Sequence, residues 1–219
     1  MRSQRASRGA ALAALAVLAL GLLSPAAFGQ ERVRNHFDFD KAFGEPGFFD
    51  FVVLTGEGKA RWMIIPDPEH NPPSTPNQVT QSETERPAGS IAAAIRRTYV
   101  LRDGVVTVAV KRQAGVAGLV LRMAGEKDYL LVLLGGDGAI ETTSTRGGTA
   151  TSLAKGKASL DREWNVLSVE LSGASVKVSV NDKPILEATD PAPASGRTGL
   201  ATQGPGSAAF DELWLEIRG

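Results

Sequence analysis

The second half of this chain consists of short apolar runs separated by turn residues, and this pattern restricts the fold more than any other feature. From about Ile91 onward, β-branched residues alternate with polar ones over lengths typical of strands. The valines in Gly104–Arg112, at 106, 108 and 110, share one face, and those in Ala174–Val180 do the same. Because no longer window keeps a helical period, we expect an all-β fold of two antiparallel sheets, a jelly-roll sandwich.

Turn residues mark where the hairpins of this sandwich should lie. Asn181-Asp182 separates two runs by two residues that tolerate a positive φ. Glycine-containing breaks predict three further turns, at Gly135–Gly138, Gly147-Gly148 and Ser172-Gly173.

Ala117–Met123 and Asp128–Leu134 are apolar on both faces, which predicts strands in the middle of a covered sheet. Arg122 interrupts the first run, on the face opposite Leu119, Leu121 and Met123. A charge on an inner strand needs an ionic partner or a solvated groove.

The first residues have the layout of a bacterial Sec signal peptide. Arg2, Arg5 and Arg8 precede an apolar run of about 14 residues, which is too short to span a bilayer, and Ala27-Phe28-Gly29 supplies small residues for cleavage. We expect cleavage after Gly29 and a mature chain in the periplasm or the medium, without membrane insertion. Residues 30–219 are then expected to form a single domain.

Composition limits the classes of partner and of covalent attachment that the chain can have. The 24 Lys and Arg residues balance 24 Asp and Glu residues, and the leader holds three of the bases, so the mature chain is weakly acidic. Nucleic acid is therefore a poor partner. The absence of cysteine excludes both disulfides and a lipoprotein anchor.

The segment Pro66–Ser90 has six prolines among polar residues. It predicts a long loop that contributes little to the core. A long connection in a compact domain is either a functional loop or partly ordered.

The order of these segments, from Ala117–Met123 through Glu163–Leu171 and Gly196–Thr202 to Ala208–Ile217, resembles the concanavalin A-like lectin and glucanase superfamily. Within it, the chain is most similar to secreted bacterial domains of the 3-keto-disaccharide hydrolase type and to laminin-G-like modules, over Trp62–Ile217. The resemblance implies a curved jelly roll that binds glycans on its concave sheet and flanking loops.

The resemblance also implies where catalytic groups would stand. Hydrolase-type members carry Asn-Ser-Gly before the arginine strand and Glu-x-Gln on the next strand. Here these places read Val116-Ala117-Gly118 and Tyr129-Leu130-Leu131, without an amide or a carboxylate in the second motif. This departure argues against catalysis.

Other catalytic and metal-binding arrangements have weak support. Glycoside hydrolysis needs two converging carboxylates. The nearest pair, Glu212 and Glu216, is on the terminal strand, where solvated edge carboxylates are the simpler interpretation. His36 and His70 lack a second ligand at zinc spacing. No cofactor is expected, although Asp211 with Asp38, Asp40 and Asp50 leaves structural calcium as an option.

Sugar-binding sites combine an aromatic face with planar polar groups. Six residues of these types form the predicted ligand site: Arg61, Trp62, Gln81, Arg96, Arg122 and Tyr129. The alternative for Arg122 is a structural ion pair, and for Trp62 it is core packing. Trp164 and Trp214 are expected in the core.

Three functions remain open after these arguments. The first is a secreted, non-catalytic lectin-like module that binds a glycan or a surface. The second is a glycoside hydrolase of the 3-keto-disaccharide type, and the third is a structural or protein-interacting envelope protein.

Overall fold

The computed structural model describes residues 31–38, 40–67, 73–83, 85–111 and 115–218. These residues form fifteen β-strands and, within the described ranges, no helix. Accordingly, no described helix is long and apolar enough to cross a membrane. The expected signal peptide, residues 1–29, lies outside the described residues. The all-β prediction is confirmed.

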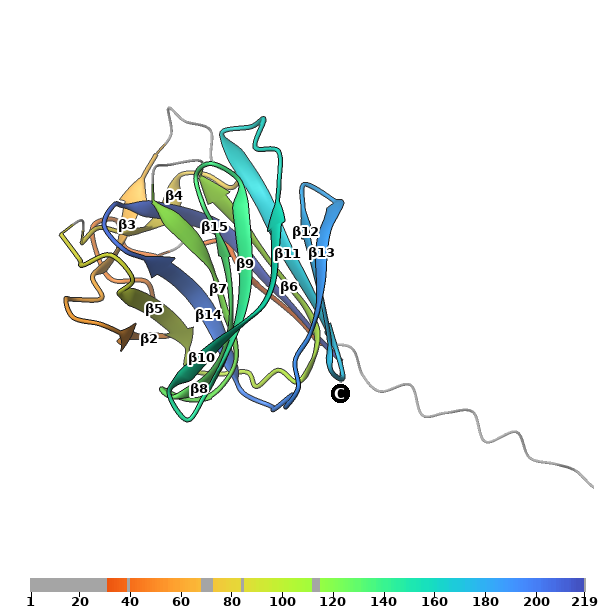
Figure 1. The fold of residues 1–219 in the computed structure, drawn as a ribbon. Coiled ribbons are helices and arrows are strands. Elements are labelled where there is room, and N and C mark those ends of the chain that lie inside the picture. Colours follow the sequence, from red (N-terminus) through yellow and green to blue (C-terminus); the bar gives the residue numbers. More distant parts are fainter. Residues whose placement is uncertain (1–30, 39, 68–72, 84, 112–114, 219) are drawn as a thin grey trace, which may run out of the picture.

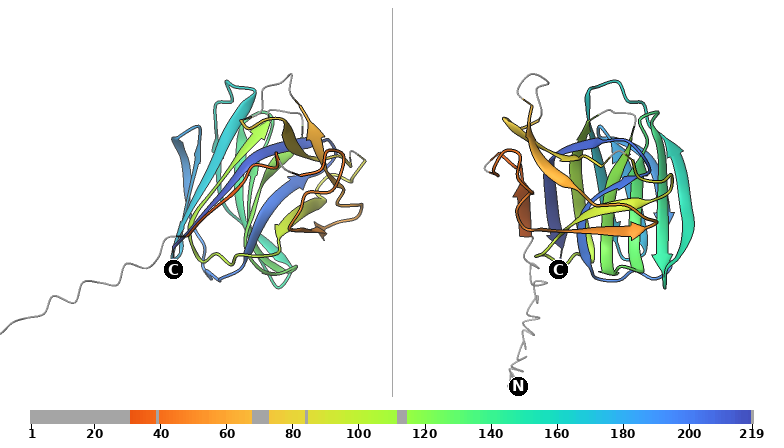
Figure 2. Two further views of the ribbon diagram at one scale, coloured as in Figure 1. Left: turned by 180° about the vertical axis from the view of Figure 1, so that it is seen from behind. Right: turned by 90° about the vertical axis from the view of Figure 1, so that its left-hand side faces the viewer.

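Two antiparallel sheets form the two layers of the molecule (Figures 1 and 2). The eight-stranded sheet has the order β13-β12-β11-β6-β15-β4-β3, and β1 pairs with β15 beside β4. Its strands are β1 (Glu31–Asn35), β3 (Trp62–Pro66), β4 (Asn77–Gln81), β6 (Asp103–Lys111), β11 (Trp164–Ser172), β12 (Ser175–Val180), β13 (Lys183–Thr189) and β15 (Ala208–Arg218).

The seven-stranded sheet has the order β10-β9-β8-β7-β14-β5-β2. Its strands are β2 (Phe49–Thr55), β5 (Ile91–Arg96), β7 (Val116–Gly125), β8 (Asp128–Leu134), β9 (Ala139–Arg146), β10 (Thr149–Lys157) and β14 (Arg197–Gln203). The doubly apolar segments β7 and β8 lie in its interior, as predicted.

The core lies between the sheets and follows the alternation in the sequence. The valines at 106, 108 and 110 of β6 and at 176, 178 and 180 of β12 all point into it. They meet Leu119 and Leu121 of β7 and Leu130 of β8 from the opposite layer. Burial of each such side chain contributes about 1.5–3 kcal/mol to stability.

The predicted turns are confirmed. Asn181 and Asp182 both have positive φ, 51° and 64°, and connect β12 to β13 as a two-residue hairpin turn. The glycine-containing breaks connect β8 to β9, β9 to β10 and β11 to β12.

Two expectations about individual segments, Pro66–Ser90 and the terminal strand, are wrong. The segment Pro66–Ser90 is not one long loop, because β4 lies within it and buries Asn77, Val79 and Gln81 between its neighbours β3 and β15. The terminal strand β15 is not an edge, because it pairs with β6 on one side and with β4 and β1 on the other.

The predicted face of Arg122 is also wrong. The pairing of β7 with β8 is irregular between Leu121 and Gly125, and Arg122 has a φ of 50°. This bulge breaks the period of two. Met123 consequently packs with Val120 in an apolar cluster on the outer face of this sheet. Arg122 points inward and donates to the carbonyl of Gly173, next to β11 of the opposite sheet.

The outer face of the seven-stranded sheet is concave. Thr55 ends β2, and Tyr129 lies in β8, four strands away in the sheet order. In a flat sheet their backbones would be about 19 Å apart, farther than a threonine and a tyrosine side chain can span, yet Thr55 Oγ1 and Tyr129 Oη are 3.3 Å apart. The sheet therefore curls around its own outer side chains, which explains how Tyr129 and Leu131 are buried on that face.

Candidate functional site

A groove of about 400 Å³ lies on this concave face. Strands β2, β5, β8, β9, β10 and β14 supply most of its walls and floor. It is lined by Thr55, Gly89, Ile91, Tyr129, Leu131, Leu133, Glu141, Thr143, Thr145, Ala150, Ser152 and Gln203. A volume of this size is typical of small-molecule binding sites.

The floor of the groove is built by strand register. Three apolar side chains of β8 each stand opposite a polar side chain of β9, in the pairs Tyr129–Thr145, Leu131–Thr143 and Leu133–Glu141. The next strand, β10, continues the row with Ser152 opposite Thr143 and Ala150 opposite Thr145. An apolar lane thus runs beside a lane of hydroxyl groups.

The groove is almost free of net charge. Glu141 is the one carboxylate among its described lining residues, and Lys155 Nζ lies 3.4 Å from its Oε1. Both side chains are exposed, so the pair contributes little to stability. Such a surface suits a neutral ligand with hydroxyl groups and apolar faces.

Of the six predicted ligand residues, Tyr129 lies in this groove. Tyr129 is only 2% exposed, and its hydroxyl group contacts Thr55 Oγ1. Tyr129 therefore shapes the floor and joins β8 to the end of β2.

Arg61, Trp62 and Gln81 lie at the other sheet, where Trp62 and Gln81 are cross-strand partners in β3 and β4. Trp62 is 1% exposed, and its ring centroid is 5.7 Å from that of Phe210 in the core. Gln81 is buried, donates to the Glu83 carbonyl and accepts from Arg86 Nη2. Arg61, just before β3, is exposed.

Arg96 is buried and links the two layers. Its Nη1 donates to Asn35 Oδ1 over 3.0 Å, and its guanidinium lies 5.4–5.9 Å from the ring centroids of Phe48, Phe49 and Tyr99. Burial lowers the pKa of this guanidinium.

Arg122 is also buried between the sheets. It donates to the carbonyls of Arg102 (2.8 Å) and Gly173 (2.7 Å), and its Nη1 lies 3.2 Å from Asp190 Oδ2. The six predicted residues thus do not converge on one surface: Tyr129 lies at the groove, and five lie elsewhere.

The acidic residues that were considered as calcium ligands do not all lie together. Asp211 is buried and accepts hydrogen bonds from the backbone N–H and the hydroxyl group of Ser74, and that hydroxyl also lies 3.3 Å from Asp38 Oδ1. Asp50 is bound by Arg97 and Arg197 instead. Across the described ranges, no three His, Cys, Asp or Glu side chains form a group that could hold a metal ion.

Burial raises the pKa of Asp211 to about 6, against the lowering effect of its hydrogen bonds from Ser74 and Glu212. Glu212 and Glu216 are bound by arginines: Glu212 by Arg34, and Glu216 by Arg32 and Arg218. His70 lies outside the described residues, and His36 Nδ1 is 2.9 Å from Asp38 Oδ2.

Sequence reasoning missed most of the groove, and β9 explains why. Its outward residues Glu141, Thr143 and Thr145 are polar, but its inward residues include Thr142 and Ser144, which are also polar and buried. Alternation therefore could not show which face of this strand is in the core. Register with β8 gave no signal either, because Asp128–Leu134 is apolar on both faces and does not show which of them is outward.

Comparisons with known proteins identify solved structures that share this fold. No protein-family model and no curated protein matches the sequence. Among solved structures, the carbohydrate-binding module CBM66 from Bacillus subtilis aligns with a TM-score of 0.55 at 15% identity, covering 77% of this chain and 97% of that one. A Bacillus subtilis protein of unknown function with a galectin-like fold aligns with a TM-score of 0.52 at 14% identity, over 72% and 90% of the two chains.

The exoplasmic/lumenal domain of VIP36, bound to Ca²⁺ and Man3GlcNAc, aligns with a TM-score of 0.53 at 17% identity, over 80% of this chain and 86% of that one. At these identities the likeness concerns the fold. It agrees with the two-sheet architecture, with the concave seven-stranded sheet and with the resemblance in the sequence. The chain has a jelly-roll sandwich fold of two antiparallel sheets, the fold that it shares with these solved structures.

Proposed function

We propose that this protein is a secreted, non-catalytic module that binds a neutral glycan in the concave groove of the seven-stranded sheet. The observation that carries the proposal is the groove itself, in which an apolar lane on β8 lies beside hydroxyl groups on β9 and β10. Sugar rings present apolar faces and hydroxyl edges side by side, so both lanes can be used by one ligand. The periplasm or the medium is the proposed location.

Binding is favoured over hydrolysis by the positions that hydrolase-type relatives use. Tyr129 and Leu131 stand at the Glu-x-Gln places, and both lie on the groove floor. The remaining carboxylate, Glu141, is paired with Lys155 and has no second acid among the described lining residues. A two-carboxylate mechanism therefore has no counterpart there.

The fold comparisons add support of a general kind. CBM66 is by its name a carbohydrate-binding module, and VIP36 was solved with Man3GlcNAc. These similarities concern the fold. They support a glycan ligand for this chain only in combination with the chemistry of the groove.

The proposal is tested by thermal shift of the chain from Gln30 against neutral hexasaccharides of glucose, mannose, xylose and fructose, each with and without calcium. A ligand at about one hundred times its Kd adds about 2.7 kcal/mol, which raises the Tm by roughly 5–10 °C for a domain of this size. A rise with calcium alone would instead support structural calcium near Asp211 and Asp38.

A matched pair of variants locates the site. Ser152 and Thr151 are adjacent and exposed on β10, but Ser152 lines the groove, whereas Thr151 stands opposite the inward-facing Ser144. Ser152→Arg should abolish the saccharide-induced shift, and Thr151→Arg should preserve it. Equal shifts in both variants would contradict binding in the groove and favour a structural or protein-binding role for this face.

A further inference from the structure

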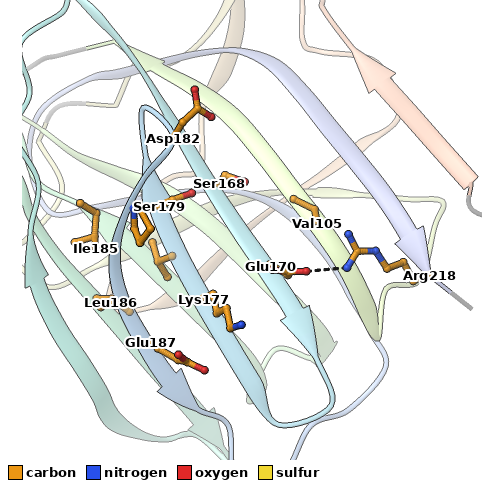
Figure 3. A pocket seen from close by; sticks show the side chains of 12 residues that line it. Val105, Ser168, Glu170, Lys177, Ser179, Asp182, Ile185, Leu186, Glu187 and Arg218 are labelled. Carbon is orange, nitrogen blue, oxygen red and sulfur yellow. Dashed lines mark hydrogen bonds and ion pairs between the residues drawn. The ribbon is translucent and has the colours of Figure 1, made fainter.

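A second hollowed surface lies on the outer face of the other, eight-stranded sheet. Two adjoining cavities of about 570 and 230 Å³ share Val105 of β6. Together they extend from β1 and β15 across β6 and β11 to β12 and β13. Figure 3 shows the larger cavity, with Val105, Ser168 and Ser179 on neighbouring strands and Asp182 in the turn beyond.

Trp214 stands in the smaller cavity and is 40% exposed, contrary to its predicted place in the core. The cause is a bulge in β15 between Asp211 and Trp214, where Glu212 has a φ of 51°. The bulge shifts the alternation, so that Leu213 and Leu215 face the core and Trp214 faces outward.

The indole of Trp214 is held in a fixed position. Its Nε1 donates to Glu212 Oε2 over 2.8 Å, and the guanidinium of Arg34, its cross-strand partner in β1, lies 4.9 Å from the ring centroid. Arg34 in turn donates to Glu212. Such fixing lowers the entropy that an aromatic side chain loses when a ligand stacks on it.

A row of hydroxyl groups begins on the strand next to the indole. Thr107 of β6 lies opposite Trp214 in the sheet, and its hydroxyl group is 3.0 Å from that of Ser168 in β11. Ser179 of β12 is the register partner of Ser168. An aromatic ring and three hydroxyl groups thus lie in a row across the strands, and the apolar Val105 lies next to this row, two residues before Thr107 on β6.

The charges around this row nearly balance, with one more acid than bases. The lining includes four acids, Glu170, Asp182, Glu187 and Glu216, and three bases, Arg32, Lys177 and Arg218. Arg218 binds both Glu170 and Glu216 at 2.8 Å (Figure 3 shows the first pair). A surface without net positive potential does not favour nucleic acid or another polyanion.

We propose that this outer face is a second binding site, for a neutral oligosaccharide that stacks one ring on Trp214 and extends over Thr107, Ser168 and Ser179. The site is separate from the concave groove, because it lies on the opposite outer face of the sandwich. A chain with sites on both faces would bridge two glycan strands, and its apparent affinity for a polysaccharide would exceed that of either site.

The indole signals test the second site directly. In ¹H–¹⁵N spectra the three tryptophans give three indole resonances. On titration with the same neutral hexasaccharides, the Trp214 resonance should move, while that of the buried Trp62 should stay. An unmoved Trp214 resonance with every saccharide would overturn the proposal.

Variants then separate the two sites. In the Ser152→Arg background, Trp214→Ala should weaken the remaining binding about two- to tenfold, because it removes the stacking surface, and Trp214→Phe should retain most of the binding, because it keeps an aromatic ring. If Ser152→Arg alone removes all binding, the concave site stands and the second site fails. If only Trp214→Ala removes it, the second site stands and the concave groove fails.

Discussion

Arg122 joins the two layers of the sandwich, although it belongs to a strand rich in leucine and valine. Its guanidinium satisfies the carbonyls of Arg102 and Gly173 and pairs with the buried Asp190. Arg122→Met takes the Arg122 donor from the carbonyls of Arg102 and Gly173 and leaves Asp190 with Arg146 as its remaining ion-pair partner. It should therefore lower the free energy of unfolding by about 3–5 kcal/mol. Urea denaturation at neutral pH measures this loss.

The matched control is Lys157→Met, which removes an exposed ion pair with Asp137 and should change stability little. A small loss in Arg122→Met, similar to that control, would mean that the buried network does not hold the sheets together.

Asp211 makes a pH-dependent contribution to the free energy of unfolding, and its sign is opposite to the usual one for a carboxyl group. Burial raises its pKa from 3.8 to about 6, so the folded state binds this proton more tightly than the unfolded chain. Its contribution is present below about pH 4 and is lost as the pH rises through 6, by about 3 kcal/mol in total. The stability of Asp211→Asn relative to wild type should therefore rise over that interval, as measured by urea denaturation at several pH values.

Asp137→Asn provides a control of opposite sign. A hydrogen bond from Lys157 holds the pKa of Asp137 below its usual value, so its contribution is lost as the pH falls. If Asp211→Asn and wild type keep a constant difference from pH 4 to pH 7, the buried carboxyl does not titrate in that range.

At the scale of elements, the turn between β12 and β13 is held by local conformation. Asp182 has a φ of 64°, which glycine adopts without the steric cost that a β-branched residue incurs. Asp182→Val should lower the free energy of unfolding by about 1–2 kcal/mol, and Asp182→Gly should be neutral or stabilising. Thermal unfolding of both variants checks this order, and the reverse order would show that side-chain contacts of Asp182 dominate.

The strands after Ile91 were largely predictable because their alternation coincides with burial. In β6 the valines at 106, 108 and 110 face the core, and in β12 the three valines face the core and the polar residues face outward, so a period of two is visible. Strands β1 to β4 lack such a period, and β4 has Asn77, Gln78 and Gln81 buried together with Val79. Their position is fixed by pairing with β3 and β15, which one sequence does not reveal.

Bulges explain the errors in face assignment. Arg122 and Glu212 both have positive φ at irregular points of their strands, and each shifts the residues that follow to the other face. Met123 and Trp214 were therefore predicted on the wrong side. Neither bulge contains a glycine at these positions to signal it.

At the scale of the whole molecule, the decisive property is the curvature of the seven-stranded sheet. It brings Thr55 to Tyr129 and creates the groove from residues spread between positions 55 and 203. The resemblance to concanavalin A-like proteins predicted a concave sheet, but it did not identify the residues on it. Of the six predicted ligand residues, the groove contains Tyr129, because the selection relied on residue type and not on the face of each strand.

The central claim, that the concave groove binds a neutral glycan, is tested most directly by methyl NMR during titration with neutral hexasaccharides. Leu131, Leu133 and Thr143 line the groove, whereas Leu130 and Val132 of the same strand face the core. We predict that the methyl signals of Leu131, Leu133 and Thr143 shift with one saccharide class and that those of Leu130 and Val132 shift much less. Unchanged signals from the three groove residues with every saccharide would contradict the claim.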